Sequence, residues 1–151
     1  KHRGPNIVTS LELDPAEMEK RNIHLQQKYA EIEEKEVRYE EIHCDDAEYL
    51  IVAFGSCARI AQKAMEEARA EGIKVGLLRP ITLWPFPSKA IAERSRQVKG
   101  ILTVELNAGQ MVEDVRLAVE CKVPVEYFGR LGGIVPDPDE VVTALKEKII
   151  K

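Results

Sequence analysis

The segment Tyr49-Leu-Ile-Val-Ala-Phe54 is a continuous apolar run, and Gly55 ends it. A run of this kind is typical of a strand that is buried on both faces of a parallel sheet. We expect Ser56 to cap a helix that continues through Ala70, with Gly72 as its C-terminal stop. The segment therefore predicts one strand-to-helix unit of an α/β protein.

The same kind of unit recurs along the chain at intervals of about 25 residues. Further buried strands are expected at Lys74–Leu78, Ile101–Leu106 and Val123–Phe128, and helices at about Ser88–Val98, at about Gln110–Cys121 and from Asp137 onward. Val37–Cys44 alternates apolar and polar residues, which suits an edge strand. We therefore predict a five-stranded, mostly parallel sheet with helices on both faces and one antiparallel strand, the first, at or near an edge.

The N-terminal part of the chain differs from the rest. Residues 1–14 show no periodicity, so we interpret them as a linker. From Pro15 to about Glu36 the pattern becomes helical, and Asp14 is placed to cap this helix. Its apolar residues form one narrow stripe, made of Met18, Leu25, Tyr29 and Ile32. We predict a linker and docking helix over residues 1–36 and a separate domain over residues 37–151.

Composition excludes several classes of function. The net charge of −4, with both signs interleaved, argues against a nucleic-acid-binding protein. No apolar run approaches the roughly 20 residues of a membrane span. Cys44, Cys57 and Cys121 are odd in number and contain no CxxC pair, which favours reduced thiols and a cytoplasmic location. Since the chain begins without methionine, we expect it to be part of a longer protein.

The segment Leu77–Pro87 holds the strongest candidate site residues. Three prolines and the only tryptophan make the loop after the strand stiff and shaped. Arg79 comes directly before a proline at the end of a buried strand, where its side chain needs either a structural carboxylate or a ligand anion. Aromatic residues make up only 5% of the chain, so we favour an interface role for Trp84 and Phe86 over a core role. Thr82 belongs to the same candidate surface.

Two other loops follow parallel strands and add Asn107, Gly109, Gln110 and Arg130 as interface or ligand-loop candidates. Such loops open onto helix N-termini, whose free N–H groups favour anions. The glycines of residues 129–133 lack the GxGxxG spacing of a dinucleotide site, and no GxxxxGK phosphate loop is present. We therefore interpret this glycine loop as a flexible connection with one basic side chain.

The remaining chemistry-bearing residues suggest no active site. Cys57 begins a helix without a histidine nearby in sequence, which favours a packing role. His43 and Cys44 point to opposite faces of a strand, which disfavours joint metal binding. We predict no catalytic residues and no metal ligands in this chain.

Three segments resemble a known family. Val75–Pro87, Val104–Arg116 and Val123–Arg130 are similar to the C-terminal domain of the alpha subunit of 2-oxoacid:ferredoxin oxidoreductases, and most similar to the 2-ketoisovalerate, or branched-chain, members. The resemblance implies a three-layer α/β/α fold of the transketolase C-terminal type. It also implies a parent enzyme that uses thiamine diphosphate, magnesium, iron–sulfur clusters and coenzyme A to oxidise a 2-oxoacid and reduce ferredoxin.

The family's cofactor motifs are absent here, so the resemblance implies a non-catalytic assembly domain that binds no cofactor itself. Its implied partners are the beta, gamma and delta subunits, and ferredoxin through the complex; a homodimer is left open. Two alternatives remain. One is a domain that binds coenzyme A or another small molecule through the loops around Arg79 and Gln110. The other is the equivalent domain of another thiamine enzyme, such as a transketolase or a 2-oxoacid dehydrogenase.

Overall fold

The computed structural model describes residues 4–7 and 11–150 and divides into two units, residues 1–35 and residues 36–151. The predicted linker includes residues 1–3 and 8–10, which lie outside the described residues. The described part of the first unit holds one helix, α1 (Pro15–Lys35). The second unit holds five strands and the remaining helices.

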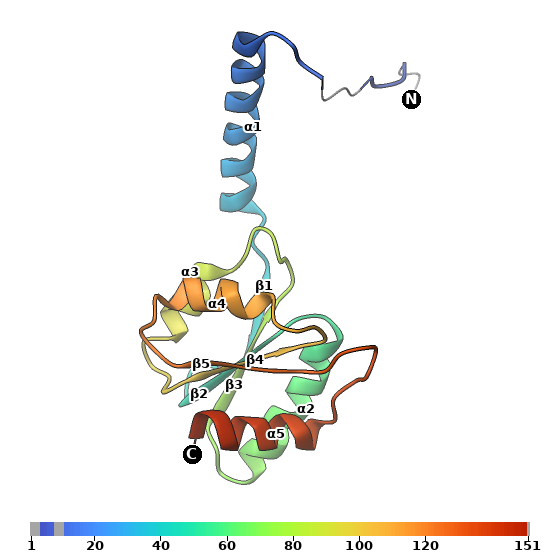
Figure 1. Ribbon diagram of the computed structural model, residues 1–151. Helices are drawn as coiled ribbons and strands as arrows, with labels where there is room; N and C mark the ends of the chain where they lie inside the picture. The colour runs from blue at the N-terminus through green and yellow to red at the C-terminus, as the bar shows by residue number, and fades with distance from the viewer. Residues whose placement is uncertain (1–3, 8–10, 151) are drawn as a thin grey trace. The chain divides into compact units, whose positions relative to one another are not determined.

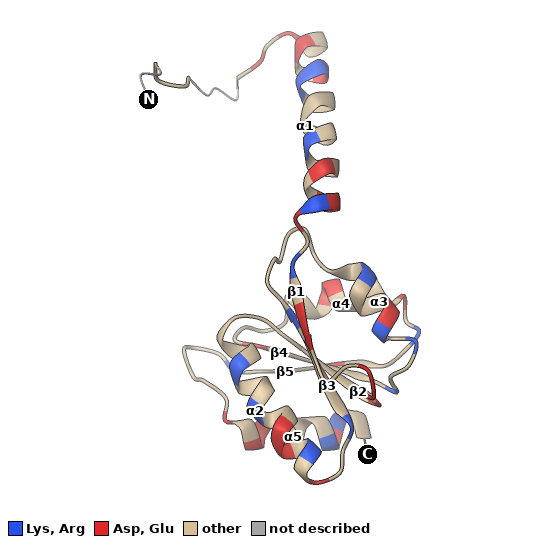
Figure 2. Ribbon diagram, turned by 180° about the vertical axis from the view of Figure 1, so that it is seen from behind, with Lys and Arg blue, Asp and Glu red and all other residues tan. Residues whose placement is uncertain are grey.

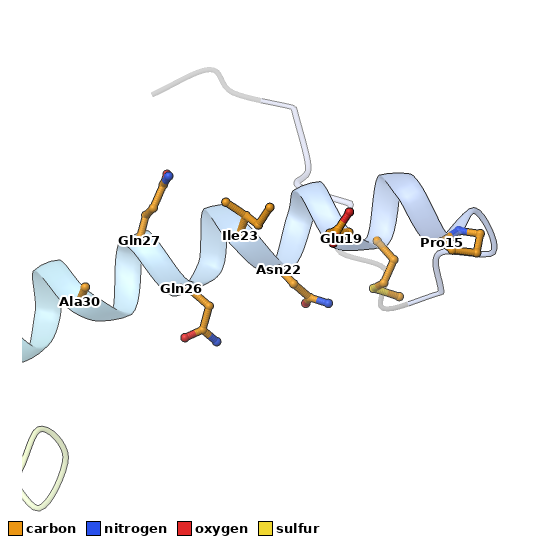
Figure 3. Close-up of a pocket in the computed structure, with 8 residues that line it drawn as sticks. Pro15, Glu19, Asn22, Ile23, Gln26, Gln27 and Ala30 are labelled. Carbon is orange, nitrogen blue, oxygen red and sulfur yellow. The ribbon is translucent and has the colours of Figure 1, made fainter.

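Helix α1 begins where its cap is expected. The Asp14 carboxylate accepts the backbone N–H of Ala16 at 2.8 Å. The helix carries charged residues of both signs, and none of its residues is buried (Figure 2). A shallow groove follows the side of the helix that carries Pro15, Ile23 and Ala30, among amide side chains (Figure 3).

The second unit is built on a five-stranded sheet with the order β1-β3-β2-β4-β5. The strands are β1 (Tyr39–Ile42), β2 (Tyr49–Ala53), β3 (Val75–Pro80), β4 (Ile101–Glu105) and β5 (Val125–Gly129). Strand β1 lies at one edge and pairs antiparallel with β3, while all other neighbours are parallel. The predicted sheet, with its antiparallel edge strand, is confirmed.

Helices cover both faces of the sheet (Figure 1). On one face lie α2 (Ser56–Ala70) and α5 (Pro138–Leu145), and on the other lie α3 (Ser88–Arg94) and α4 (Met111–Val119). A π-helical segment, η1 (Lys146–Ile150), follows α5. Successive residues of β2 enter opposite cores: Ile51 packs with α2 and α5, whereas Leu50 and Val52 pack with α3 and α4. The predicted three-layer α/β/α class is therefore confirmed.

Several predicted boundaries are wrong by a few residues. Strand β1 is half as long as expected, because His43 has a φ of 53° and turns the chain. Strand β3 continues through Pro80, which pairs with Tyr39. Ser56 is not a cap, since the N-cap of α2 is Gly55, without a side-chain hydrogen bond.

The helices on the second face end early. Helix α3 stops at Arg94, and the Ser95 hydroxyl donates to the Ala92 carbonyl at 2.8 Å. Helix α4 stops at Val119 because Glu120 and Cys121 have left-handed backbones with φ values of 51° and 60°. Neither helix needs a glycine to end. A side chain can hydrogen-bond to a carbonyl of the preceding turn, and a non-glycine residue can adopt the left-handed conformation.

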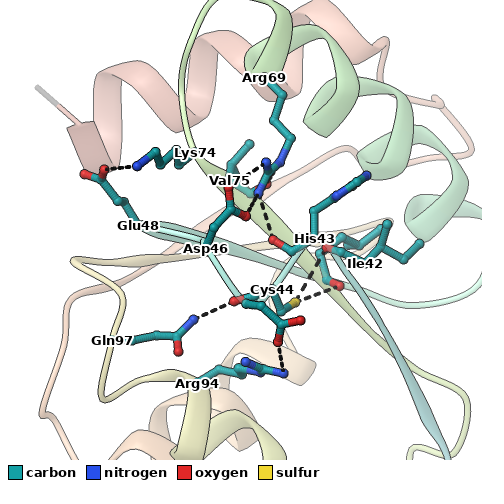
Figure 4. Close-up of polar contacts among 12 residues, drawn as sticks. Ile42, His43, Cys44, Asp46, Glu48, Arg69, Lys74, Val75, Arg94 and Gln97 are labelled. Carbon is teal, nitrogen blue, oxygen red and sulfur yellow. Dashed lines mark hydrogen bonds and ion pairs between the residues drawn. The ribbon is translucent and has the colours of Figure 1, made fainter.

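The turn between β1 and β2 is held from both faces of the sheet (Figure 4). Arg69 of α2 donates to the carbonyl oxygens of Val75 at 2.7 Å and of His43 at 2.8 Å, and pairs with Asp46. Arg94 of α3 forms a two-bond ion pair with Glu41. This turn precedes β2, so these ion pairs lie at the amino edge of the parallel strands and not at their carboxyl edge.

Candidate functional site at the carboxyl edge of the sheet

Exposed apolar side chains of the second unit gather at one edge of the sheet. Most of the large exposed apolar residues described in this unit lie in loops that follow parallel strands. Tyr39 lies beside Pro80, the last residue of β3. Leu117, on α4, is the exception among the described residues. The side chains at this edge are Tyr39, Phe54, Ile81, Leu83, Trp84, Leu106, Leu131, Ile134 and Val135. We call this set the apolar edge. Exposed apolar side chains that gather on one part of a protein surface often mark an interaction site.

The chain reverses its winding direction at the centre of this edge. From β2 it crosses to β3 on one side, and β4 lies on the other side of β2. Helices α2 and α4, which follow β2 and β4, lie on opposite faces of the sheet and so diverge from the two neighbouring strand ends. Ligands in open α/β sheets bind in the crevice outside such strand ends.

A pocket of about 560 Å³ lies at these two strand ends. Its walls are apolar at Phe54, Leu83 and Leu106 and polar at Asn107 and Gln110. The remaining lining residues are Gly55, Ser56, Cys57, Val104, Glu105, Met111 and Asp114. The structure therefore brings Asn107 and Gln110, two of the predicted site residues, together with Leu83. Leu83 belongs to the loop between β3 and α3, residues 81–87, which we call the proline loop.

The proline loop presents Leu83 and Trp84 outward. The Thr82 hydroxyl accepts the backbone N–H of Arg38 at 3.0 Å and donates to the carbonyl oxygen of Pro85 at 2.8 Å. Pro85 is buried, and Phe86 is half-buried against the core beneath α3 and α4. Trp84 remains 54% exposed. Of the two aromatic candidates, Trp84 therefore faces outward, and Phe86 supports the loop from inside the domain.

Both candidate arginines have carboxylate partners within the domain. Arg79 of β3 donates to Glu40 of β1 at 2.8 Å, across the antiparallel pair. Arg130 pairs with Glu140 of α5 at 3.2 Å. Neither arginine lines the pocket.

Glu105 is a site residue that sequence reasoning missed. It ends β4, is only 5% exposed, and its carboxylate accepts the backbone N–H groups of Gln110 at 3.1 Å, Met111 at 2.8 Å and Val112 at 2.9 Å. A carboxylate is stabilised by the free N–H groups and the positive dipole end of a helix. Glu105 therefore occupies the N-terminus of α4, where the sequence suggested room for a ligand anion.

The loop between Glu105 and α4 is tightly folded. The Asn107 side chain accepts the backbone N–H of Gly109 at 2.7 Å, and Gly109 has a φ of 102° that favours glycine. The Tyr127 hydroxyl of β5 donates to the Asn107 carbonyl oxygen. Asn107 and Gly109 thus shape the loop, whereas Gln110 remains exposed at its end.

Burial and Glu105 set the protonation of the neighbouring groups. Burial, followed by the charge of Glu105, raises the pKa of the Cys57 thiol. The same two causes, in the same order, raise the pKa of the Tyr127 hydroxyl. Both groups therefore stay neutral near pH 7, and a reactive thiolate is not favoured at Cys57.

Comparison with known proteins identifies the domain. Residues 47–141 match the family model described as pyruvate:ferredoxin oxidoreductase core domain II. The chain belongs to this family. The resemblance drawn from the three sequence segments is confirmed, and so is the oxidoreductase interpretation over the alternative of another thiamine enzyme.

The curated relatives are subunits of 2-oxoacid oxidoreductases. The ketoisovalerate oxidoreductase subunit VorB of Methanothermobacter thermautotrophicus is 51% identical over 94% of this chain and 40% of its own length. The 2-oxoglutarate synthase subunit KorA of Methanothermobacter marburgensis is 33% identical over 67% of this chain and 27% of its own length. The chain thus spans about 40% of the VorB relatives it matches.

Solved structures agree with the family. One match is the 2-oxoglutarate:ferredoxin oxidoreductase from Magnetococcus marinus, solved with 2-oxoglutarate, coenzyme A and succinyl-CoA bound. The TM-score is 0.75 and the sequence identity is 25%, and the match covers 90% of this chain and 24% of that one. A split-gene transketolase, an inactive beta4 tetramer, matches with a TM-score of 0.64 and 22% identity, over 73% of this chain and 40% of that one, which supports the fold alone. Among the described residues, no helix has the length and apolar character needed to cross a bilayer.

Proposed function

We propose that this chain is the assembly domain of an alpha-type subunit of a 2-oxoacid:ferredoxin oxidoreductase. The parent enzyme would convert a 2-oxoacid, coenzyme A and oxidised ferredoxin into an acyl-CoA, carbon dioxide and reduced ferredoxin. The domain would contribute contact surface and no catalytic residue. The observation that carries the proposal is the outward position of Leu83 and Trp84 on a loop that Thr82, Pro85 and Phe86 anchor within the domain.

The apolar edge has the composition of an interface. Aromatic residues are enriched in the buried centres of protein–protein contacts, and Trp is prominent among the residues that dominate binding energy. Trp84, the only tryptophan of the chain, lies on this surface. We propose the beta, gamma and delta subunits as its partners, with ferredoxin reached through the complex.

We further propose a branched-chain 2-oxoacid as the parent's substrate. Identity to the ketoisovalerate oxidoreductase subunits is 47–51%, against 33% to the KorA subunits of the same genus. The location proposed for the enzyme is the cytoplasm, in keeping with three free cysteines.

The residues of this chain do not fit the parent's metal cofactors. Cys44 and Cys57 lie in hydrophobic cores on opposite faces of the sheet. Within the described ranges, no three His, Cys, Asp or Glu side chains are grouped as metal ligands. Magnesium and the iron–sulfur clusters would therefore be held by other parts of the enzyme, and we propose the same for thiamine diphosphate.

The pocket at the strand crossover supports a second candidate function, the binding of a small molecule. Its volume of about 560 Å³ is within the range of ligand sites. Its carboxylates, however, disfavour anions such as coenzyme A or a 2-oxoacid, because like charges repel strongly where water is partly excluded.

Substitution in the full-length subunit tests the assembly role. We expect Trp84→Ala to weaken co-purification of the partner subunits while leaving the thermal unfolding midpoint unchanged. Leu117→Ala is the matched control, since Leu117 is 76% exposed but lies on α4, away from the apolar edge. Equal recovery of partner subunits with both variants would contradict the proposal.

A further inference from the structure

The pocket combines apolar walls with two acidic side chains. Phe54, Leu83 and Leu106, which form its rim, are each between 41% and 47% exposed. Glu105 and Asp114 are its acidic residues, and the described lining contains no Lys, Arg or His. A group that binds here must therefore cover apolar surface and also carry positive charge to pair with the acidic side chains.

Asp114 is the carboxylate that remains available. Glu105 already accepts the three N–H groups at the start of α4. Asp114 lies in the first turn of α4 and forms no ion pair within the described part of the chain. Its neighbour Glu113 instead pairs with Arg116 at 2.7 Å. The two adjacent acidic residues therefore differ. Asp114 lines the pocket and has no basic partner among the described residues, whereas Glu113 lies outside the lining and pairs with Arg116.

We propose that the pocket receives a segment of a partner subunit in which a basic side chain is flanked by apolar side chains. This inference rests on the proposed function and names the chemistry of the contact. The aliphatic stem of a Lys or Arg packs against Phe54 and Leu83, and its charged head pairs with Asp114. The flanking apolar residues cover Trp84 and Leu106 on the surrounding apolar edge.

A second copy of this chain could not fill the pocket with either candidate arginine of its own edge. The two candidate arginines there, Arg79 and Arg130, pair with Glu40 and Glu140 of their own domain. A heterologous partner that supplies its own basic residue avoids this conflict.

Charge substitution within the full complex tests this inference. We expect Asp114→Lys, and more mildly Asp114→Asn, to weaken binding of the partner subunit, by roughly tenfold or more for the lysine variant. Wild-type affinity should fall with rising salt, and Asp114→Asn should flatten that dependence. Glu113→Lys is the matched control, because it changes the same charge in the same helical turn outside the pocket lining. Equal losses from Asp114→Lys and Glu113→Lys would overturn the inference.

A photo-crosslinking amino acid in place of Leu83 identifies the occupant directly. We expect the cross-linked peptide to belong to a partner subunit and to contain Lys or Arg among apolar residues. A partner peptide without a basic residue would overturn this inference and leave the assembly role standing. Cross-links confined to the subunit's own chain, or no cross-link, would overturn both.

Discussion

The carboxylate of Glu105 accepts the backbone N–H of Met111 at 2.8 Å, so the last residue of β4 caps the helix that follows it. The bond closes the loop between them, and this loop forms one wall of the pocket. An acidic side chain from the strand thus takes the place that a bound anion occupies in many proteins of this class. Its effect is to stabilise the loop and to make the pocket acidic.

We predict that Glu105→Ala destabilises the domain by about 2–3 kcal/mol, because it leaves buried N–H groups without an acceptor. Glu105→Gln should cost less, since its amide oxygen can still accept from one or two of them. Urea unfolding of both variants measures the difference. A loss below about 0.5 kcal/mol for the alanine variant would show that water replaces the carboxylate freely.

The alternation of strands and helices was predictable because it depends on local patterns. The apolar run of β2 lies between two layers of helices, and Leu50, Ile51, Val52 and Ala53 are all fully buried. Each strand of this kind needs cover on both faces, and the intervening segments carry helical periodicity with stop signals such as Gly72. These patterns determine the class of fold without knowledge of distant contacts.

The role of Glu105 could not be predicted in the same way. A glutamate at the end of an apolar run suggests a strand terminus in solvent, since buried acids are rare. Its partners lie five to seven residues further on and meet it only once the loop has folded back. One feature of the sequence could have indicated this role: Glu105 is a charged residue within an otherwise uncharged strand, shortly before a helix. The pairing of Arg79 with Glu40 likewise depends on sheet register, which local patterns do not reveal.

Thr82 should control the position of the proline loop. We predict that Thr82→Val, which keeps the shape but removes the hydroxyl, destabilises the domain by about 1–2 kcal/mol. It should also weaken partner binding, because the Thr82 hydroxyl bonds the carbonyl oxygen of Pro85, across Leu83 and Trp84, and the backbone N–H of Arg38. Thr82→Ser keeps the hydroxyl and is the control. Urea unfolding measures the change in stability, and co-purification measures the change in partner binding. Identical behaviour of Thr82→Val and Thr82→Ser would contradict the anchoring role of the hydroxyl.

Cys44 should make stability decrease at alkaline pH. Burial, and then the nearby charge of Glu41, raises the pKa of this thiol from 9.0 to about 11. The folded state therefore holds the proton more tightly than the unfolded state does. Its contribution is fully present below about pH 9, and it is lost as the pH rises toward 11, because the unfolded thiol ionises first.

The matched variant for this prediction is Cys44→Ala. Other groups also titrate above pH 9, so the relevant quantity is the difference in free energy of unfolding between wild type and Cys44→Ala at each pH. We expect this difference to be constant from pH 7 to 8.5 and to shrink between pH 9 and 11, the range set by the two pKa values. A difference independent of pH up to 11 would mean that Cys44 ionises equally in both states. Reaction with a thiol reagent provides a second check at pH 8: the exposed Cys121 should react at once, and the buried Cys44 and Cys57 only on unfolding.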